Sequence, residues 1–247
     1  WRKVNEGEGS LVFGKGNVPH DPGKYVNDSA FAAGGMCPIQ PMAQSNVQAG
    51  PVSLHIFDQP LYYTPPVGPA INFKVEYHYK DTKQPSNFNF SSLGNKWTFT
   101  WLSFVVDDPK NPRADADIYL RGGGDFTYTD FNISSNSYAP ELQSNDVLVR
   151  VCPNCYELRH PDGSKDIYAR PDGNTSKGRR IFLTEIVDAQ GNSITFSYDS
   201  LLRIRALEDA IGQVTTLSYE NPADVYKITK VTDPFGRHTS LDSATHS

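Results

Sequence analysis

The sequence predicts an all-β protein of antiparallel strands, and three observations lead to this prediction. Its 247 residues include 13 Tyr and 13 Phe, mostly alternating with Thr, Ser and Asn, a pattern typical of pleated strands. The 19 Gly and 18 Pro supply frequent turns, and few stretches suit a long helix. A unit of 21 residues recurs near the C-terminus. We therefore expect strand–turn–strand repeats forming a β-strip or spiral wall, preceded by a β-rich aromatic domain.

Composition divides the chain into three parts. Residues 1–50 are polar and rich in Gly, Pro and Asn without sustained periodicity, so we expect an irregular lead-in. Residues 51–155 contain short alternating segments and form the expected β-rich domain, and residues 156–247 carry the repeats. Because the chain begins at Trp1 without an initiator Met, we expect a processed product or an excerpt of a longer protein.

Two segments of the central part have strong strand patterns. Residues 71–79 place apolar side chains on one face and Asn, Lys, Glu and His on the other, as in a half-buried strand. Residues 97–106 alternate at first and then become apolar on both faces, which predicts one strand sandwiched between two layers. Further short strands are expected at residues 52–57, 116–121, 126–131, 147–151 and 156–160.

Each repeat unit contains a turn that begins with Asp and ends with Gly three residues later. An Asp carboxylate accepts nearby backbone N–H groups, and Gly fits the left-handed position that closes the turn. The first two Asp residues lie 21 residues apart, and the third follows after 24. The predicted turn residues are Asp188, Gly191, Asp209, Gly212, Asp233 and Gly236. The repeat aromatics, Tyr198 and Tyr219, also lie 21 residues apart.

The strand that leaves each turn alternates, so that one of its faces can be buried. One hairpin cannot bury such a face alone, and we expect neighbouring hairpins to pack side by side into a strip. The expected buried residues are Ile194, Phe196 and Tyr198 in the first repeat and Val214, Thr216 and Ser218 in the second.

The motif Asp-x-x-Gly-x-x-Thr/Ile-x-x-x-Tyr-Asp, followed by Arg-Ile, resembles the YD repeat of RHS proteins. This family includes the shells of insecticidal toxin complexes and the teneurins. Residues 198–204 correspond to its Tyr-Asp-x-x-Gly-Arg-Leu, with Leu202 in place of Gly, and Glu220 replaces the second Asp. Residues 93–97 resemble the Leu-Gly-x-x-Trp that precedes the repeats, and residues 162–164 resemble the Asp-Gly hairpin before the array.

The resemblance covers residues 156–247 well and residues 51–247 loosely. It implies a β-strip that spirals into the hollow shell or wall of a large secreted or surface protein, such as a bacterial toxin-delivery shell. We therefore expect an extracellular, non-enzymatic structural protein without a cofactor, which forms part of a shell, a fibre or a self-assembling structure. Its expected partners are further repeats of the same polypeptide or other copies of the chain, pairing through strand edges.

Charge and hydropathy argue against two classes of partner. The net charge is −5, and the densest basic group, residues 177–180, lies in a loop rich in Gly, Asn and Ser that we expect to be a solvated turn. We therefore expect no nucleic-acid partner, since phosphate binding needs clustered Lys and Arg. The sequence has no run of about 18 apolar residues, and we expect no membrane span.

Three interpretations remain open for Cys152 and Cys155, which flank a Pro-Asn turn between two expected strands. A structural turn suits the spacing, with the cysteines either reduced or joined in a disulfide. A zinc site would need two further ligands, for which only Cys37 and His160 are candidates. A redox role would need a thioredoxin-like βαβ setting, which the pattern lacks.

Binding of a carbohydrate or another surface ligand is the alternative function, because exposed aromatic side chains on a sheet stack on sugar rings. Trp97 and Trp101 are the candidate stacking residues, although core packing explains them equally well. His55 and His78 lie on expected neighbouring strands, but no recognisable nucleophile or ordered triad accompanies them. An enzyme of unknown type would need a polar pocket with perturbed titratable groups, and we expect no catalytic residue.

Overall fold

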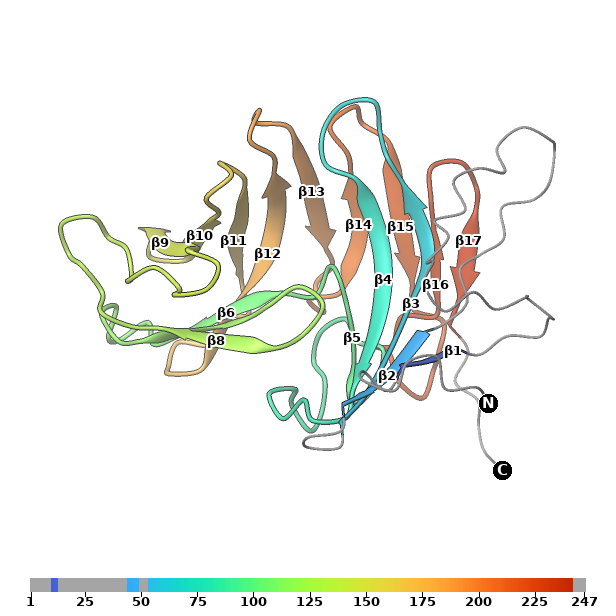
Figure 1. The fold of residues 1–247 in the computed structure, drawn as a ribbon, viewed down its shortest axis with the longest axis horizontal. Helices are drawn as coiled ribbons and strands as arrows, with labels where there is room; N and C mark the ends of the chain where they lie inside the picture. Colours follow the sequence, from blue (N-terminus) through green and yellow to red (C-terminus); the bar gives the residue numbers. More distant parts are fainter. Residues whose placement is uncertain (1–9, 13–43, 49–52, 242–247) are drawn as a thin grey trace.

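The computed structural model describes residues 10–12, 44–48 and 53–241, which form two sheets connected by turns and loops (Figure 1). The predicted all-β class is confirmed, because these residues contain no helix and every pair of neighbouring strands is antiparallel. A helix long and apolar enough to cross a bilayer is accordingly absent from the described part of the chain.

The smaller sheet has five strands in chain order. They are β1 (Ser10–Val12), β2 (Gln44–Gln48), β3 (Ser53–Tyr63), β4 (Ile71–His78) and β5 (Trp97–Phe99). β1 and β2 lie in the segment predicted to be irregular, so that prediction is wrong for these two stretches. Their sequences lack a strand period, but backbone pairing from β3 to β2 and from β2 to β1 extends the sheet across them. The remainder of the predicted lead-in lies outside the described residues.

The larger sheet has twelve strands, of which β9 to β17 pair consecutively, each with the next along the chain. Its strands are β6 (Phe104–Asp107), β7 (Ala116–Tyr119), β8 (Asp125–Tyr128), β9 (Val147–Cys152), β10 (Cys155–Arg159), β11 (Lys165–Pro171), β12 (Arg179–Val187), β13 (Ser193–Tyr198), β14 (Ile204–Glu208), β15 (Val214–Ser218), β16 (Lys230–Thr232) and β17 (His238–Ser240).

The larger sheet branches at β12. One edge of β12 pairs with β11, whereas the other edge is shared between two strands. Residues 179–182 pair with β6, and residues 185–187 pair with β13. β6, β7 and β8 therefore extend away from the repeats (Figure 1). The domain boundary predicted at residue 155 does not follow the sheets, because β9, before it, pairs with β10, after it.

The five-stranded sheet covers one face of the repeat strands, and Figure 1 shows β3 and β4 lying across β14 and β15. The two sheets share one apolar core. It includes Leu61, Tyr63, Ile71 and Phe73 from the smaller sheet and Phe196, Leu207, Leu217 and Val231 from the larger sheet. In this part of the molecule, the inner face of the strip is therefore filled by another sheet and does not line a hollow.

Residues 97–106 do not form the single strand predicted for them. β5 belongs to the smaller sheet and β6 to the larger one, and residues 100–103 connect the two. The pattern is apolar on both faces because Trp101 and Leu102 are buried where the chain crosses between the layers. The prediction of burial between two layers was correct, but the extended conformation does not continue through the crossing.

The buried face of the second repeat also differs from the prediction. Val214 and Thr216 are exposed, whereas Thr215 and Leu217 are buried. Side chains alternate between faces, so an alignment error of one residue exchanges the buried and exposed sets. The distance from the turn Gly gives the correct frame, because Ile194 lies three residues after its Gly, as Thr215 does after the next. The prediction took Val214 as the first buried residue because it is more apolar than Thr215, and the predicted set of buried residues therefore began one position too early.

Candidate functional site

The three predicted Asp-Gly turns have the same backbone hydrogen bonds. In the first, the Gly191 N–H donates to the Asp188 carbonyl (3.0 Å) and the Asp188 N–H donates to the Asn192 carbonyl (2.9 Å). The turns that begin at Asp209 and Asp233 repeat both bonds. Each turn lies in the five residues that connect two neighbouring strands of the larger sheet, and its Gly is left-handed.

The Asp side chains complete these turns and do not face an open site. Each Oδ1 accepts two backbone N–H groups at 2.8–3.0 Å. Each Oδ2 has a different partner: the Asn192 amide for Asp188, the Tyr63 hydroxyl for Asp209 and the Arg237 guanidinium for Asp233. The hydrogen bond from Asn192 lowers the pKa of Asp188 below its ordinary value. These carboxylates therefore serve as acceptors within the fold.

A fourth turn of the same kind begins at Asp199, with Leu202 in the position that Gly occupies in the other three turns. The Leu202 N–H donates to the Asp199 carbonyl (3.2 Å), and Leu202 adopts φ 59°, in the left-handed region. Leu202 therefore keeps the turn, although a residue with a side chain is unfavoured in that conformation. Burial acts to raise the pKa of Asp199, but hydrogen bonds from Arg203 outweigh it, and the pKa is lowered.

The repeat tyrosines make equivalent contacts. The Tyr198 hydroxyl donates to the Leu183 carbonyl (2.6 Å), and the Tyr219 hydroxyl donates to the Ile204 carbonyl (2.8 Å). Each acceptor lies 15 residues before its tyrosine. Burial raises the pKa of both hydroxyls, so they remain protonated donors at neutral pH. The repeat therefore recurs in its hydrogen bonds as well as in its sequence.

Cys152 and Cys155 are joined in a disulfide that closes the β9–β10 hairpin. The two sulfur atoms are bonded to each other, and of the three interpretations the structure therefore places the pair in a structural turn. His160, one of the two candidate zinc ligands, directs Nδ1 to Asp146 (2.9 Å). Cys37, the other candidate, lies outside the described residues.

The basic residues 177–180 were predicted to lie in a solvated turn, but this is wrong for Arg179, which begins β12 and forms a buried ion pair with Asp107 of β6. Arg179 and Asp107 are only 6% and 5% exposed, and the guanidinium makes two hydrogen bonds to the carboxylate, of 2.9 and 2.6 Å. The Tyr156 hydroxyl donates to the same carboxylate (2.9 Å), and Arg179 also donates to Asn154 in the disulfide turn. The partner lies 72 residues earlier in the chain, so no local pattern could have revealed it.

The predicted stacking tryptophans do not form an exposed platform. Trp101 is 2% exposed and packs against Phe73, with ring centroids 5.0 Å apart, so the prediction of ligand stacking is wrong for this residue. Trp97 is half-buried and packs against Tyr77, with ring centroids 5.4 Å apart. Core packing between the sheets therefore accounts for the burial of Trp101 and for much of the burial of Trp97.

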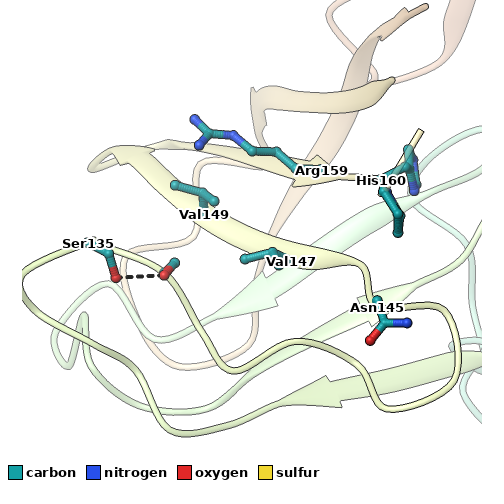
Figure 2. Close-up of a pocket in the computed structure, with 8 residues that line it drawn as sticks. Ser135, Asn145, Val147, Val149, Arg159 and His160 are labelled. Carbon is teal, nitrogen blue, oxygen red and sulfur yellow. Dashed lines mark hydrogen bonds between the residues drawn. The ribbon is translucent and has the colours of Figure 1, made fainter. Parts of the chain in front are cut away.

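A surface groove of about 370 Å³ lies along β9. Figure 2 shows Val147 and Val149 between Ser135 on one side and Asn145 on the other, with Arg159 nearby. Polar side chains around an apolar floor can bind a small polar ligand with an apolar face. No sequence pattern predicts this groove, because its lining comes from two loops and two strands that carry no common motif.

His160 lies at one end of this groove, between two carboxylates. Its Nε2 is buried without a hydrogen-bond partner, 3.9 Å from Asp166 Oδ2. Burial raises the pKa of Asp166, although Arg121 forms an ion pair with it at 2.9 Å. The Ser135 hydroxyl lies at the opposite end of the groove (Figure 2) and is hydrogen-bonded to Ser137 (2.7 Å). This arrangement holds a histidine in place, and the described residues show no hydrogen bond between it and a nucleophile.

His55 and His78 are paired opposite each other on β3 and β4, and their rings stack at 4.4 Å. Glu76 Oε2 lies 2.9 Å from Nε2 of His55 and 3.4 Å from Nε2 of His78. Lys74 Nζ lies 3.0 Å from the other carboxylate oxygen. The strand pattern places Glu76 on the same face as His78, but it does not show that this carboxylate lies between the two histidines.

The hydrogen bonds of this cluster stabilise the charged forms of its ionisable groups. Burial acts to raise the pKa of Glu76, but hydrogen bonds from His78, Lys74 and His55 outweigh it and lower the pKa to about 2. The hydrogen bond to Glu76 raises the pKa of His78. The carboxylate is therefore ionised at neutral pH, with two imidazoles on one of its oxygens.

No protein-family model matches the chain, and a search of curated proteins finds no significant match.

Proposed function

We propose that this chain is a non-enzymatic structural segment of an RHS-type shell or surface fibre. The observation that carries the proposal is the recurrence of the turn hydrogen bonds and of the tyrosine-to-carbonyl bond in successive hairpins. Hairpins that repeat these bonds add to a strip one after another, each pairing with the edge strand of the one before. The disulfide fits an extracellular location, because oxidising compartments preserve such bonds.

The proposed growth point is the outer edge of β17. Among the described strands, β17 pairs only with β16. The Leu241 N–H donates to the Thr229 carbonyl, and hydrogen-bonded pairs alternate along antiparallel strands. The N–H groups of His238 and Ser240 consequently point away from β16. In the proposed assembly, they pair with a strand from a further repeat or a second copy.

Light scattering over a range of protein concentrations tests this proposal on the full chain. We expect association that Ser240→Pro weakens at least about tenfold, because Pro removes an outward N–H while edge strands tolerate it. Ser240→Ala is the matched control, since it removes the same hydroxyl but keeps the N–H. A chain that stays monomeric at every concentration, or a Pro variant that associates like the control, would contradict the proposal.

We propose surface-ligand binding as a second function, located at the groove beside β9 and not at the tryptophans. The observation in its favour is that polar side chains line the groove on both sides of Val147 and Val149 (Figure 2). Arg159 is the proposed anchoring donor for a sugar hydroxyl or carboxylate. Glycan-array screening of the wild type and Arg159→Ala tests it. Specific hits that the variant loses would support the proposal, whereas an array without hits would remove it.

A further inference from the structure

We propose that His55, Glu76 and His78 form a binding site for a divalent transition-metal ion, with Zn²⁺ as the best fit. This inference is independent of the structural role proposed above. Two imidazole nitrogens and one carboxylate oxygen are a donor set that suits zinc and its neighbours in the transition series. The ion would be held on the outer face of the five-stranded sheet by side chains of β3 and β4.

The three donor atoms are already close to the spacing that an ion requires. Ligand atoms about 2.0–2.2 Å from a tetrahedral ion lie roughly 3.4 Å from one another. Glu76 Oε2 lies 2.9 and 3.4 Å from the two imidazole nitrogens, and all three donor atoms fall within 4.8 Å of one another. The backbone pairing of His55 with His78 fixes both rings on one face, so small side-chain rotations are enough to centre them on an ion.

The surroundings of the carboxylate also suit a metal ligand. Ligating carboxylates are usually held by a hydrogen bond to the oxygen that does not bind the ion. Here Lys74 Nζ lies 3.0 Å from Glu76 Oε1, which leaves Oε2 to the imidazoles. Glu76 is only 8% exposed, whereas the two histidine side chains are each 31% exposed. The site is therefore buried at the carboxylate and open to solvent at the imidazoles, where water can complete the coordination.

A glycine turn forms one wall of the site. Gly122 accepts a hydrogen bond from Nε2 of His78 at 3.0 Å, so its carbonyl oxygen lies beside the proposed site. A Cβ at Gly123 would come within 3.1 Å of the His78 ring, and one at Gly122 within 3.0 Å of Glu76. Side chains at either position would crowd the cluster. Binding would displace the Nε2 proton of each imidazole, so affinity should fall in acid.

Isothermal titration of the untagged, chelator-treated full chain with Zn²⁺ tests the proposal, and Co²⁺ provides an absorption spectrum that reports on the ligands. We expect one ion per chain and a rise in melting temperature on binding. His55→Ala should weaken Zn²⁺ binding by at least about 100-fold. Removing a group that only supports a ligand lowers metal affinity by about 10–100-fold, and removing a direct ligand should lower it further. His238→Ala is the control, since this exposed histidine on β17 lies outside the cluster.

The variants distinguish this site from binding elsewhere on the chain. His78→Ala or Glu76→Gln could impair folding, so circular dichroism must first show native strand content. His55→Ala, at a partly exposed position, keeps the proposal testable if either of those variants unfolds. Loss of binding in His55→Ala with retention in His238→Ala would support the site. Absence of stoichiometric Zn²⁺ binding by the wild type, or equal binding by His55→Ala, would overturn the proposed metal site. The three residues would then be only a hydrogen-bonded cluster.

Discussion

Arg179→Met is expected to destabilise the protein by about 3–5 kcal/mol, the usual cost of leaving a buried charge without its partner. The substitution keeps an unbranched apolar chain but removes the guanidinium. Asp107 would remain only 5% exposed and, among the described residues, would keep the Tyr156 hydroxyl as its one side-chain donor. Because the pair joins β6 to β12, we expect the loss to affect the whole fold.

Urea unfolding followed by tryptophan fluorescence measures this effect, since Trp97 and Trp101 lie where the two sheets meet. At about 2–4 °C per kcal/mol for chains of this size, the melting temperature should fall by roughly 6–20 °C. The double variant Arg179→Met/Asp107→Leu should recover a large part of the loss, because neither charge then remains buried. A single-variant cost below about 1 kcal/mol, or a double variant that loses the sum of both singles, would refute the reasoning.

Three further predictions concern the turns. Gly212→Ala should cost about 1–2 kcal/mol in urea unfolding, because φ is +83° and no neighbouring atom would contact the added Cβ, so that backbone strain acts alone. The pKa values of Asp188 and Asp199 in the folded protein lie below the ordinary 3.8. The contribution of these two carboxylates to the free energy of unfolding is therefore present above pH 3.8 and is lost as the pH falls through the folded pKa values. A free energy of unfolding that stays constant down to about pH 2 would contradict this prediction. Replacing Cys152 and Cys155 by Ser should cost at most about 2 kcal/mol, since the disulfide closes a very short loop, and calorimetry can check this.

The sequence was sufficient to predict the class, most strands and the repeat turns, because these depend on short-range chemistry. An Asp that accepts two nearby N–H groups and a left-handed Gly require only a few residues of context. Period-two alternation likewise located β4 within one residue. The frame of β15 was missed, because Val214 is more apolar than the buried Thr215 beside it. Local hydropathy was in this case a poorer guide than the distance from the turn glycine.

The candidate metal site could not be predicted from local sequence, because contacts between distant segments bring its residues together. His55 and His78 were placed on neighbouring strands, but their register depends on a bulge in β3, which no sequence period predicts. The approach of the Gly122 turn from the other sheet is a tertiary contact between segments 44 residues apart. Gly122 and Gly123 have no side chains, and this lets the turn lie against Glu76 and His78.

The branching of the larger sheet at β12 has a mechanical consequence. A pull on β12 must break hydrogen bonds to β6, β11 and β13 together, since all three flank it. β17 is held by three register pairs to a single neighbour and can be peeled away one pair at a time. Single-molecule stretching should therefore detach the C-terminal hairpins at low force. The segment around β12 would resist longest, as the fixed anchor of an extensible strip.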